Sequence, residues 1–221
     1  MITLVLEAAT YAGSVALVSE GHLLAERSVA MRGRDHEALM PAVAEVLAEG
    51  AVPLEQVERI ACGAGPGSFT SLRIAGGIAK GLALATAVPL VPVSSLVLLV
   101  ASRGELPPGR YLGAIDALRG EHYVSLVEVN ENGEVQADTS FSLVPTSELL
   151  AFASRLGAEP VVAGGSAERA TGPHARAATR LTKLIDATPA ADLAAWEPAY
   201  GRLAEAQVKW EAAHGRPLAR A

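Results

Sequence analysis

LEAATYAGSVALVSEG (residues 6–21) is matched in the second half of the chain by IDALRGEHYVSLVEVNENG (residues 115–133). In each stretch a carboxylate, Glu7 or Asp116, ends an apolar run, and a second run of β-forming residues follows. Both stretches then end in a hairpin signal, Glu-Gly in the first and Asn-Gly in the second. We therefore expect the same pair of strands to occur twice.

The pattern around these stretches predicts the rest of each unit. The expected elements are strands at 3–6, 14–19, 22–29, 59–62 and 90–93, helices at 35–50, 68–86 and 95–102, and then a strand at 134–144, a helix at 147–156 and a strand at 160–163. This order is that of the ribonuclease-H-like unit, which actin-like ATPases and sugar kinases (the ASKHA fold) contain twice, a likeness of fold alone. The breaker-rich residues 103–109 suggest a boundary. The sequence thus predicts a duplicated α/β fold with two lobes, 1–103 and 110–221; the alternative is chance likeness between two α/β halves.

Composition and charge narrow the class of protein. The chain has 221 residues, 50% of them hydrophobic, so it can bury a substantial core. The lone Cys62 excludes a disulfide framework and fits the cytosol. No signal peptide and no membrane span are expected, since prolines break the longest apolar run at 83–93.

A net charge of −6 disfavours independent binding of nucleic acid. The one basic enrichment, more simply a solvated face, comprises Arg169, His174, Arg176, Arg180 and Lys183.

The segment GPGSFTSLRIAGGIAKG, residues 65–81, is the sharpest motif. A glycine loop that leads from a strand into a helix presents backbone N–H groups and the positive end of a helix dipole, which suits an anion. Gly65, Gly67 and Ser68 are therefore candidate nucleotide contacts. The segment lacks a Walker A Gly-Lys-Ser/Thr run and the last glycine of a dinucleotide fingerprint. Ser68 is better explained as an N-cap than as a hydrolase nucleophile, because Gly-x-Ser-x-Gly is absent.

Glu7 and Asp116, with Thr10, are candidates to hold a metal-bound nucleotide in a cleft between the lobes. The competing interpretation is that each acid simply ends a strand at a turn. The five histidines contain no pair at i, i+3 or i+4 spacing, so no metal site is indicated. No cofactor is predicted.

Taken together, these segments resemble the TsaB family of bacterial tRNA threonylcarbamoyladenosine biosynthesis proteins, over nearly the whole chain. The resemblance is carried by GPGSFTSLRI (65–74), AKGLA (79–83) and PVSSL (92–96), and supported by LEAAT (6–10), His36, IDALRGEHY (115–123) and PAYGR (198–202). The glycine-proline-glycine segment is shared with the catalytic paralog TsaD. Its combination with the segments around Tyr123 and Tyr200 is specific to TsaB.

The resemblance implies a subunit that is not an enzyme by itself. In TsaD a His-x-x-x-His pair binds the metal, and Ser95 and Leu99 stand at the matching positions here. The family's role is to act as scaffold and activator of TsaD, together with the ATPase TsaE, in forming N6-threonylcarbamoyladenosine in tRNAs that read codons beginning with adenine. Contact with tRNA is expected only within that complex, in the cytoplasm.

The expected partner surface lies on the helices at 35–48 and 68–86, and the same face is expected to form a homodimer in isolation. Its candidate residues are His36, Leu39, Val43, Leu72, Arg73, Ala75, Gly76 and Ala79. Charged replacement of Leu72 or Ala75 is expected to abolish association and leave the fold intact. The adjacent glycines 76 and 77 are expected to answer a packing demand. Two residues depart from the family pattern: Glu7 replaces aspartate, and Ser71 replaces glycine, which is expected to limit how closely a partner approaches.

Two other functions remain open from the sequence. One is a free-standing actin-like-fold ATPase or kinase that uses Glu7, Thr10, Asp116 and the glycine loop. The other is a serine peptidase that acts through Ser68.

Overall fold

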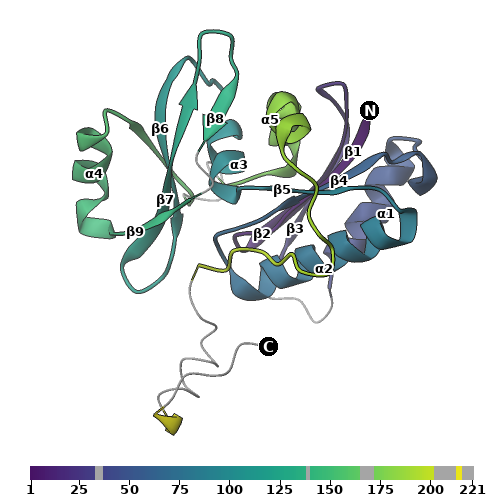
Figure 1. Ribbon diagram of the computed structural model, residues 1–221, viewed down its shortest axis with the longest axis horizontal. Coiled ribbons are helices and arrows are strands. Elements are labelled where there is room, and N and C mark those ends of the chain that lie inside the picture. The colour runs from purple at the N-terminus through teal and green to yellow at the C-terminus, as the bar shows by residue number, and fades with distance from the viewer. Residues whose placement is uncertain (33–36, 138–139, 165–171, 202–212, 216–221) are drawn as a thin grey trace.

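The structure is a computed structural model that describes residues 1–32, 37–137, 140–164, 172–201 and 213–215 (Figure 1). Its strands form two sheets, one in each half of the chain. The strand order is β3-β2-β1-β4-β5 in the first sheet and β10-β6-β7-β8 in the second, where β9 also pairs with β7. The predicted duplicated ribonuclease-H-like fold is confirmed.

The first sheet combines an antiparallel meander with two parallel strands, β4 and β5, that follow β1. Its strands are β1 (Ile2–Glu7), β2 (Ala12–Ser19), β3 (His22–Ala30), β4 (Arg59–Gly63) and β5 (Leu90–Val93). The helices of this half are α1 (Leu39–Glu49), η1 (Leu54–Gln56), α2 (Phe69–Thr86) and α3 (Ser95–Ala101). Glu20 and Gly21 form the predicted hairpin turn with φ angles of 48° and 77°.

The second sheet begins with the same order of elements. They are β6 (Gly109–Asp116), β7 (Glu121–Val129), β8 (Val135–Ala137), β9 (Ser142–Pro145), η2 (Thr146–Glu148), α4 (Leu149–Arg155) and β10 (Glu159–Val162). The single strand predicted at 134–144 is instead two strands, β8 and β9, which pair with different parts of β7. The Asn-Gly turn is confirmed: Asn130 Oδ1 accepts from the backbone N–H of Asn132 and of Glu134, both at 2.9 Å.

Strand alternation distributes the core over both faces of the first sheet. In β1, Leu4 and Leu6 pack in the layer with α1 and α2, whereas Val5 packs in the layer with α3. All seven residues of α3 are buried, because α3 lies between the two sheets (Figure 1). Gly113 of β6 permits this, since a Cβ there would lie 2.9 Å from the carbonyl oxygen of Leu96.

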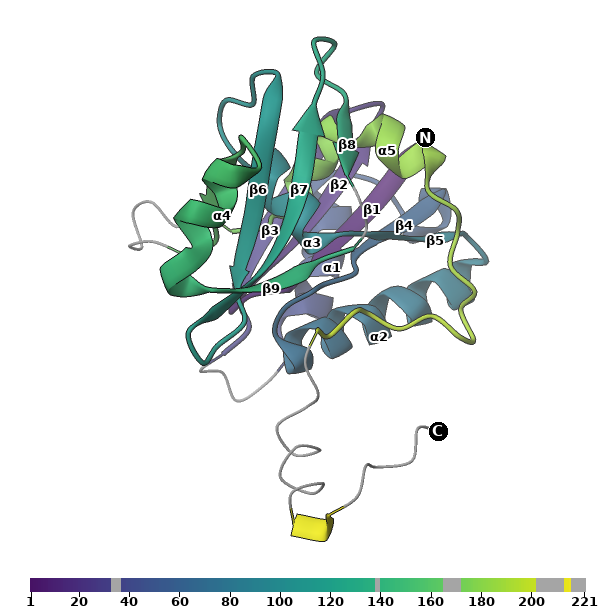
Figure 2. The same cartoon turned by 60° about the vertical axis from the view of Figure 1, so that its left-hand side comes forward.

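After β10 the chain returns to the first half. The 3-10 helix η3 (Ala175–Arg180) packs against β1, β2, β3 and α3, and α5 (Thr182–Ala187) follows it. Arg59 Nη1 of β4 pairs with Asp186 Oδ1 of α5 at 2.6 Å. Residues 188–200, here called the strap, then run along α2 (Figure 2). Residues 175–199, which the predicted division places in the second lobe, thus pack extensively against the first lobe as well.

The start of α1 also differs from the prediction. The expected N-cap, Asp35, and the candidate His36 lie outside the described residues, and α1 begins at Leu39. The side chain of Glu37 accepts from the backbone N–H of Leu39 and, at 3.1 Å, of Met40. A glutamate just before the helix therefore satisfies N–H groups that the first turn leaves unpaired.

Candidate functional site

The glycine loop between β4 and α2 is a junction of four segments of the chain. Three of its backbone N–H groups donate within the protein: Ala64 N to Val93 O at 2.7 Å, Gly65 N to Ser95 Oγ at 3.1 Å and Ser68 N to Ala9 O at 2.7 Å. The strap joins from the other side, since Ala199 N donates to Ala64 O at 2.8 Å. These groups are therefore engaged by the chain itself and are not free to cradle an anion.

The close approach of neighbouring backbone atoms explains why the loop contains glycines. A Cβ at Gly65, where φ is +83°, would lie 2.4 Å from the carbonyl oxygen of Ala199. A Cβ at Gly67 would lie 2.2 Å from the carbonyl oxygen of Ala9. Both neighbours are backbone atoms, which cannot rotate away as a side chain can. Packing alone therefore requires both glycines.

Glu7, at the end of β1, has its carboxyl group sealed beside this loop. The residue is 0% exposed; Oε1 accepts from Ala9 N at 2.5 Å and Oε2 accepts from Ser95 Oγ at 2.9 Å. A Cβ at Gly63 would lie 1.9 Å from Oε2, so the backbone covers a further side. Ser95 is the position that the resemblance matches to a metal-binding histidine of TsaD. Here it ties the carboxyl group to the loop.

The pKa of Glu7 follows from this enclosure. Burial raises it from 4.5 to about 7, although the hydrogen bonds from Ala9 and Ser95 act in the opposite direction. Burial also raises the pKa of the Cys62 thiol, and the charge of Glu7 adds to that rise. Cys62 therefore stays protonated at neutral pH and is not a nucleophile.

Asp116, the matching acid of the second unit, is exposed. Its Oδ1 accepts from Leu118 N at 2.7 Å, which is the same contact, two residues onward, that Glu7 makes with Ala9. Thr10 Oγ1 likewise accepts from the backbone N–H two residues on, at 3.3 Å. The geometry fits the interpretation that each acid ends a strand at a turn, and it gives no support to a shared metal site.

Ser68 stands at the N-cap position of α2, but its side chain does not cap the helix. Its Oγ lies 3.0 Å from Ser71 Oγ, so the predicted capping bond is replaced by a contact between two hydroxyl groups. Ser71 is 3% exposed and faces its own chain. The expectation that this serine limits the approach of a partner is therefore wrong.

Most residues predicted for the partner surface lie in the core of this chain. The exposed fraction is 0% for Leu39, Leu72, Ala75 and Ala79 and 1% for Val43. Gly76 is buried under the strap, since a Cβ there would lie 3.0 Å from Pro198 Cγ. Arg73 alone among the described candidates is exposed. Because Leu72 and Ala75 are core residues, charged replacements would disrupt the fold, and the prediction of an intact fold is wrong.

The outer face of α2 carries residues that the sequence prediction did not assign to the surface. Apart from the backbone of α2 itself and the neighbouring residues, the described part of the chain places no atom within 4 Å of a Cβ built on Gly77 or Gly81, and Leu84 is 76% exposed. Arg73, Gly77 and Gly81 follow each other at a spacing of four and therefore share one side of the helix. The Gly-x-x-x-Gly spacing of Gly77 and Gly81 was the sequence signal that could have identified this face. Packing explains Gly76, through the strap, but leaves Gly77 open.

The strap ends where the two lobes meet. Lys80 Nζ of α2 donates to the carbonyl oxygen of Trp196 at 2.8 Å. At the end of the strap, the ring of Tyr200 packs against the ring of Phe69, with centroids 4.5 Å apart. A Cβ on Gly201 would lie 2.5 Å from the ring of Tyr123 in β7. The two tyrosine segments that carry the specific part of the resemblance are thus neighbours in space.

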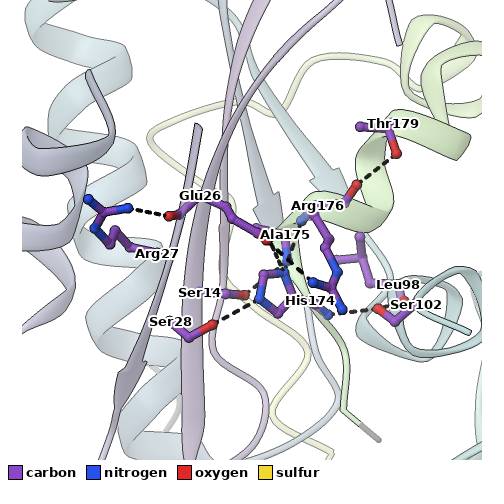
Figure 3. Close-up of polar contacts among 10 residues, drawn as sticks. All are labelled: Ser14, Glu26, Arg27, Ser28, Leu98, Ser102, His174, Ala175, Arg176 and Thr179. Atoms are coloured by element: carbon purple, nitrogen blue, oxygen red, sulfur yellow. Dashed lines mark hydrogen bonds and ion pairs between the residues drawn. The ribbon is translucent and has the colours of Figure 1, made fainter. Parts of the chain in front are cut away.

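A polar cluster joins η3 to the first sheet (Figure 3). His174 Nε2 lies 2.9 Å from Ser28 Oγ, and Nδ1 lies 3.6 Å from Glu26 Oε2. This order of serine, histidine and acid is that of a hydrolase triad, but Nδ1 accepts from Arg176 N at 3.2 Å. The ring proton therefore sits on Nε2, where it is donated to Ser28, and His174 cannot act as the base. Burial lowers the pKa of His174 and favours the neutral ring.

The described part of the chain contains no group of three His, Cys, Asp or Glu side chains arranged to hold a metal ion. None of the helices that the structure describes is both long and apolar enough to span a bilayer. Two ribonuclease-H-like sheets around a shared helix, with the glycine loop closed by its own chain, define a protein of the actin-like (ASKHA) fold class.

Comparison with known proteins identifies a family within this fold class. The family model of TsaD, tRNA N6-adenosine threonylcarbamoyltransferase, matches residues 30–167. The tRNA threonylcarbamoyladenosine biosynthesis protein TsaB of Bacillus subtilis is 30% identical over 95% of this chain and 98% of its own. YeaZ from Pseudomonas aeruginosa has a similar structure, with a TM-score of 0.67 and 29% identity over 86% of this chain and 95% of its own.

Two further TsaB proteins match a smaller part. That of Haemophilus influenzae is 38% identical over 56% of this chain, and that of Escherichia coli is 37% identical over 60%. The chain aligns with only 52% and 58% of the lengths of these two relatives. The chain therefore belongs to the family that the TsaD model describes and, within it, to the TsaB proteins.

Proposed function

We propose that this protein is an accessory subunit in the formation of N6-threonylcarbamoyladenosine in tRNA. It pairs with a TsaD-type catalytic paralog as scaffold and activator, and a TsaE-type ATPase joins the assembly in the cytoplasm. The observation that carries the proposal is the closed glycine loop, in which Glu7 and Ser95 are hydrogen-bonded to each other. A chain whose nucleotide loop is engaged internally is suited to support a catalytic partner and not to replace it.

The partner surface that we propose is the outer face of α1 and α2. The core-facing side chains of these helices hold the first sheet, whereas Arg73, Gly77, Gly81 and Leu84 remain available on α2. Small residues let the backbone of a second helix approach closely, and Leu84 offers apolar surface to bury. In the absence of the partner, a second copy of the chain occupies the same face as a homodimer. With a net charge of −6, the chain does not bind a whole tRNA tightly by itself, so stable contact with tRNA is proposed for the complex.

Size-exclusion chromatography of this chain with the TsaD-type protein of the same organism tests the proposal. We expect a heterodimer at micromolar concentration, and a weakening of about tenfold or more with Leu84→Glu, which buries a charge at the contact. Leu150→Glu is the matched control: Leu150 is 71% exposed, against 76% for Leu84, but lies on α4. Failure of the unaltered proteins to co-elute, or equal effects of both variants, would contradict the proposed surface.

The alternative of a free-standing ATPase or kinase is separated by calorimetry on the isolated chain with ATP and magnesium. Such an enzyme needs a carboxylate that reaches the metal, and Glu7 is enclosed. We expect modification of tRNA to require both this chain and the TsaD-type protein. ATP turnover by the isolated chain, at a rate that Glu7→Gln abolishes, would favour the alternative.

A further inference from the structure

A pocket of about 260 Å³ lies where the end of α3, the linker between the lobes and η3 meet. Three arginines, Arg103, Arg176 and Arg180, line it, together with small residues and Leu23 of β3, and none of the described residues that line it is acidic. The whole chain carries 24 acids against 18 lysines and arginines. The chain as a whole is negatively charged, whereas three positively charged side chains surround this cavity and create a local positive potential.

Arg180 is fixed in place without being neutralised. Its Nη1 donates to the carbonyl oxygens of Ala101, at 3.1 Å, and Arg103, and its Nη2 donates to that of Gly104 at 2.7 Å. These carbonyls belong to the last residue of α3 and the linker that follows it. Among the described residues no acid forms an ion pair with Arg180. The guanidinium is thus preorganised and keeps its full charge.

The other two arginines are each paired with an acid that does not line the pocket. Arg176 Nη1 lies 3.3 Å from Glu26 Oε1, and Arg103 Nη2 lies 2.9 Å from Glu159 Oε1. Each contact uses one nitrogen of a group with five N–H donors. Nη1 of Arg103 is buried and has no hydrogen-bond partner in the described part of the chain. Buried donors are nearly always paired, so this guanidinium has capacity for a further acceptor.

We propose that this pocket binds a phosphate group, carried either by a free nucleotide or by an RNA backbone. Arginine presents planar N–H pairs that match phosphate oxygens, and charge-assisted hydrogen bonds of this kind are the strongest that side chains make. Leu23, which is 41% exposed, supplies an apolar wall for the carbon skeleton of the ester. The site does not involve the glycine loop, and it does not depend on whether the chain pairs with a TsaD-type partner.

The test uses the chain alone with two probes, pyrophosphate in calorimetry and a short labelled RNA in a fluorescence titration. Arg176→Ala removes one cation, and Leu23→Glu places an acid on the pocket wall without altering any arginine. Arg155→Ala, on α4, is the control for loss of a cation elsewhere. Leu24→Glu is the control for the added acid, because Leu24 is equally exposed, at 41%, but does not line the pocket. Circular dichroism confirms that each variant is folded.

We expect Arg176→Ala and Leu23→Glu to weaken binding of pyrophosphate about tenfold or more, and the two controls to leave it within about twofold. If the labelled RNA also binds, and pyrophosphate displaces it, the phosphate is that of the RNA backbone, and binding weakens steeply with salt. If pyrophosphate alone binds, the ligand is a free phosphate ester. Absence of binding by both probes, or losses that do not distinguish the pocket variants from their controls, overturns the proposal.

Discussion

The carboxyl group of Glu7 bears most directly on what the glycine loop can do. Its Oε2 accepts from Ser95 Oγ at 2.9 Å. The same hydroxyl accepts from Gly65 N, so one serine connects the end of β1 to the loop. A buried acid with these partners connects the parts of the junction, and burial makes its ionised form costly even though both hydrogen bonds favour that form.

We expect Glu7→Gln to flatten the pH dependence of stability. The pKa of Glu7 is about 7 in the folded protein against 4.5 as its ordinary value. Its contribution to stability is therefore complete below pH 4.5 and is lost as the pH rises through 7. The loss approaches about 3 kcal/mol, because a tenfold change in acid dissociation corresponds to about 1.4 kcal/mol. Urea unfolding at pH 5 and pH 8 measures it.

Glu148→Gln is the control for this prediction, since Glu148 is exposed in η2 and the substitution removes the same charge. It should leave the difference between the two pH values unchanged. If Glu7→Gln and the unaltered chain lose stability equally between pH 5 and pH 8, Glu7 does not titrate as described.

At single residues, the sequence predicts positions better than contacts. The alternation of β1 places Glu7 at the end of a strand, but no local pattern shows that Ser95, 88 residues later, closes over it. Ser68 is correctly placed before α2, yet its hydroxyl finds Ser71 and not a backbone N–H. Short polar side chains have several partners within reach, and tertiary packing selects among them.

Among the elements, α2 shows most clearly that a helix has two faces with different roles. Gly76 and Gly77 are adjacent in sequence, but one lies under the strap and the other is open. We expect Gly77→Ala to raise the free energy of unfolding by about 1 kcal/mol, the usual gain from alanine over glycine in a helix. Gly76→Ala should fall short of that gain, because its Cβ meets Pro198 Cγ at 3.0 Å.

Thermal unfolding of the two single variants measures this difference under identical conditions. Each substitution adds one methyl group at neighbouring positions of the same helix, so each serves as the control for the other. Equal stabilisation by both would mean that the strap does not press on α2 at Gly76.

The elements of the first half were predictable because each has a strong periodicity and a clear breaker. The strand at Leu90–Val93 is confirmed to the residue, and α2 begins one residue after its predicted start. Apolar residues such as Leu72 and Ala75, which the sequence predicts for the partner surface, are buried in the core of this chain. The same periodicity marks a core face, which is the commoner use of an apolar stripe on a helix.

At the scale of the whole molecule, the two lobes share α3. We expect a fragment of residues 1–103 not to fold alone, because Leu96, Leu98 and Leu99 are 0% exposed in the full chain, where β6 and β7 pack against α3. Circular dichroism and amide proton dispersion of the fragment measure this. The full chain should unfold in one transition by all probes, and a folded fragment or two separate transitions would refute the expectation.

The duplication was visible in the sequence because the same order of acid, strand and hairpin turn occurs in residues 6–21 and in residues 115–133. The return of residues 175–199 to the first lobe was not visible, since it depends on contacts far apart along the chain. The bond from Ala199 N to Ala64 O is one example, and that from Ala175 N to Ser14 Oγ is another. Neither leaves a periodic or compositional signal.

The complete enclosure of α3 has a consequence for association. Enzymes of two lobes often open and close around a substrate, but here such a motion would expose part of the fully buried helix α3 to water. The two lobes therefore move as one rigid body. The surface of α1 and α2 then has the same shape before and after a protein docks on it. Little conformational entropy is then lost on docking, so even a modest contact area can support a durable complex.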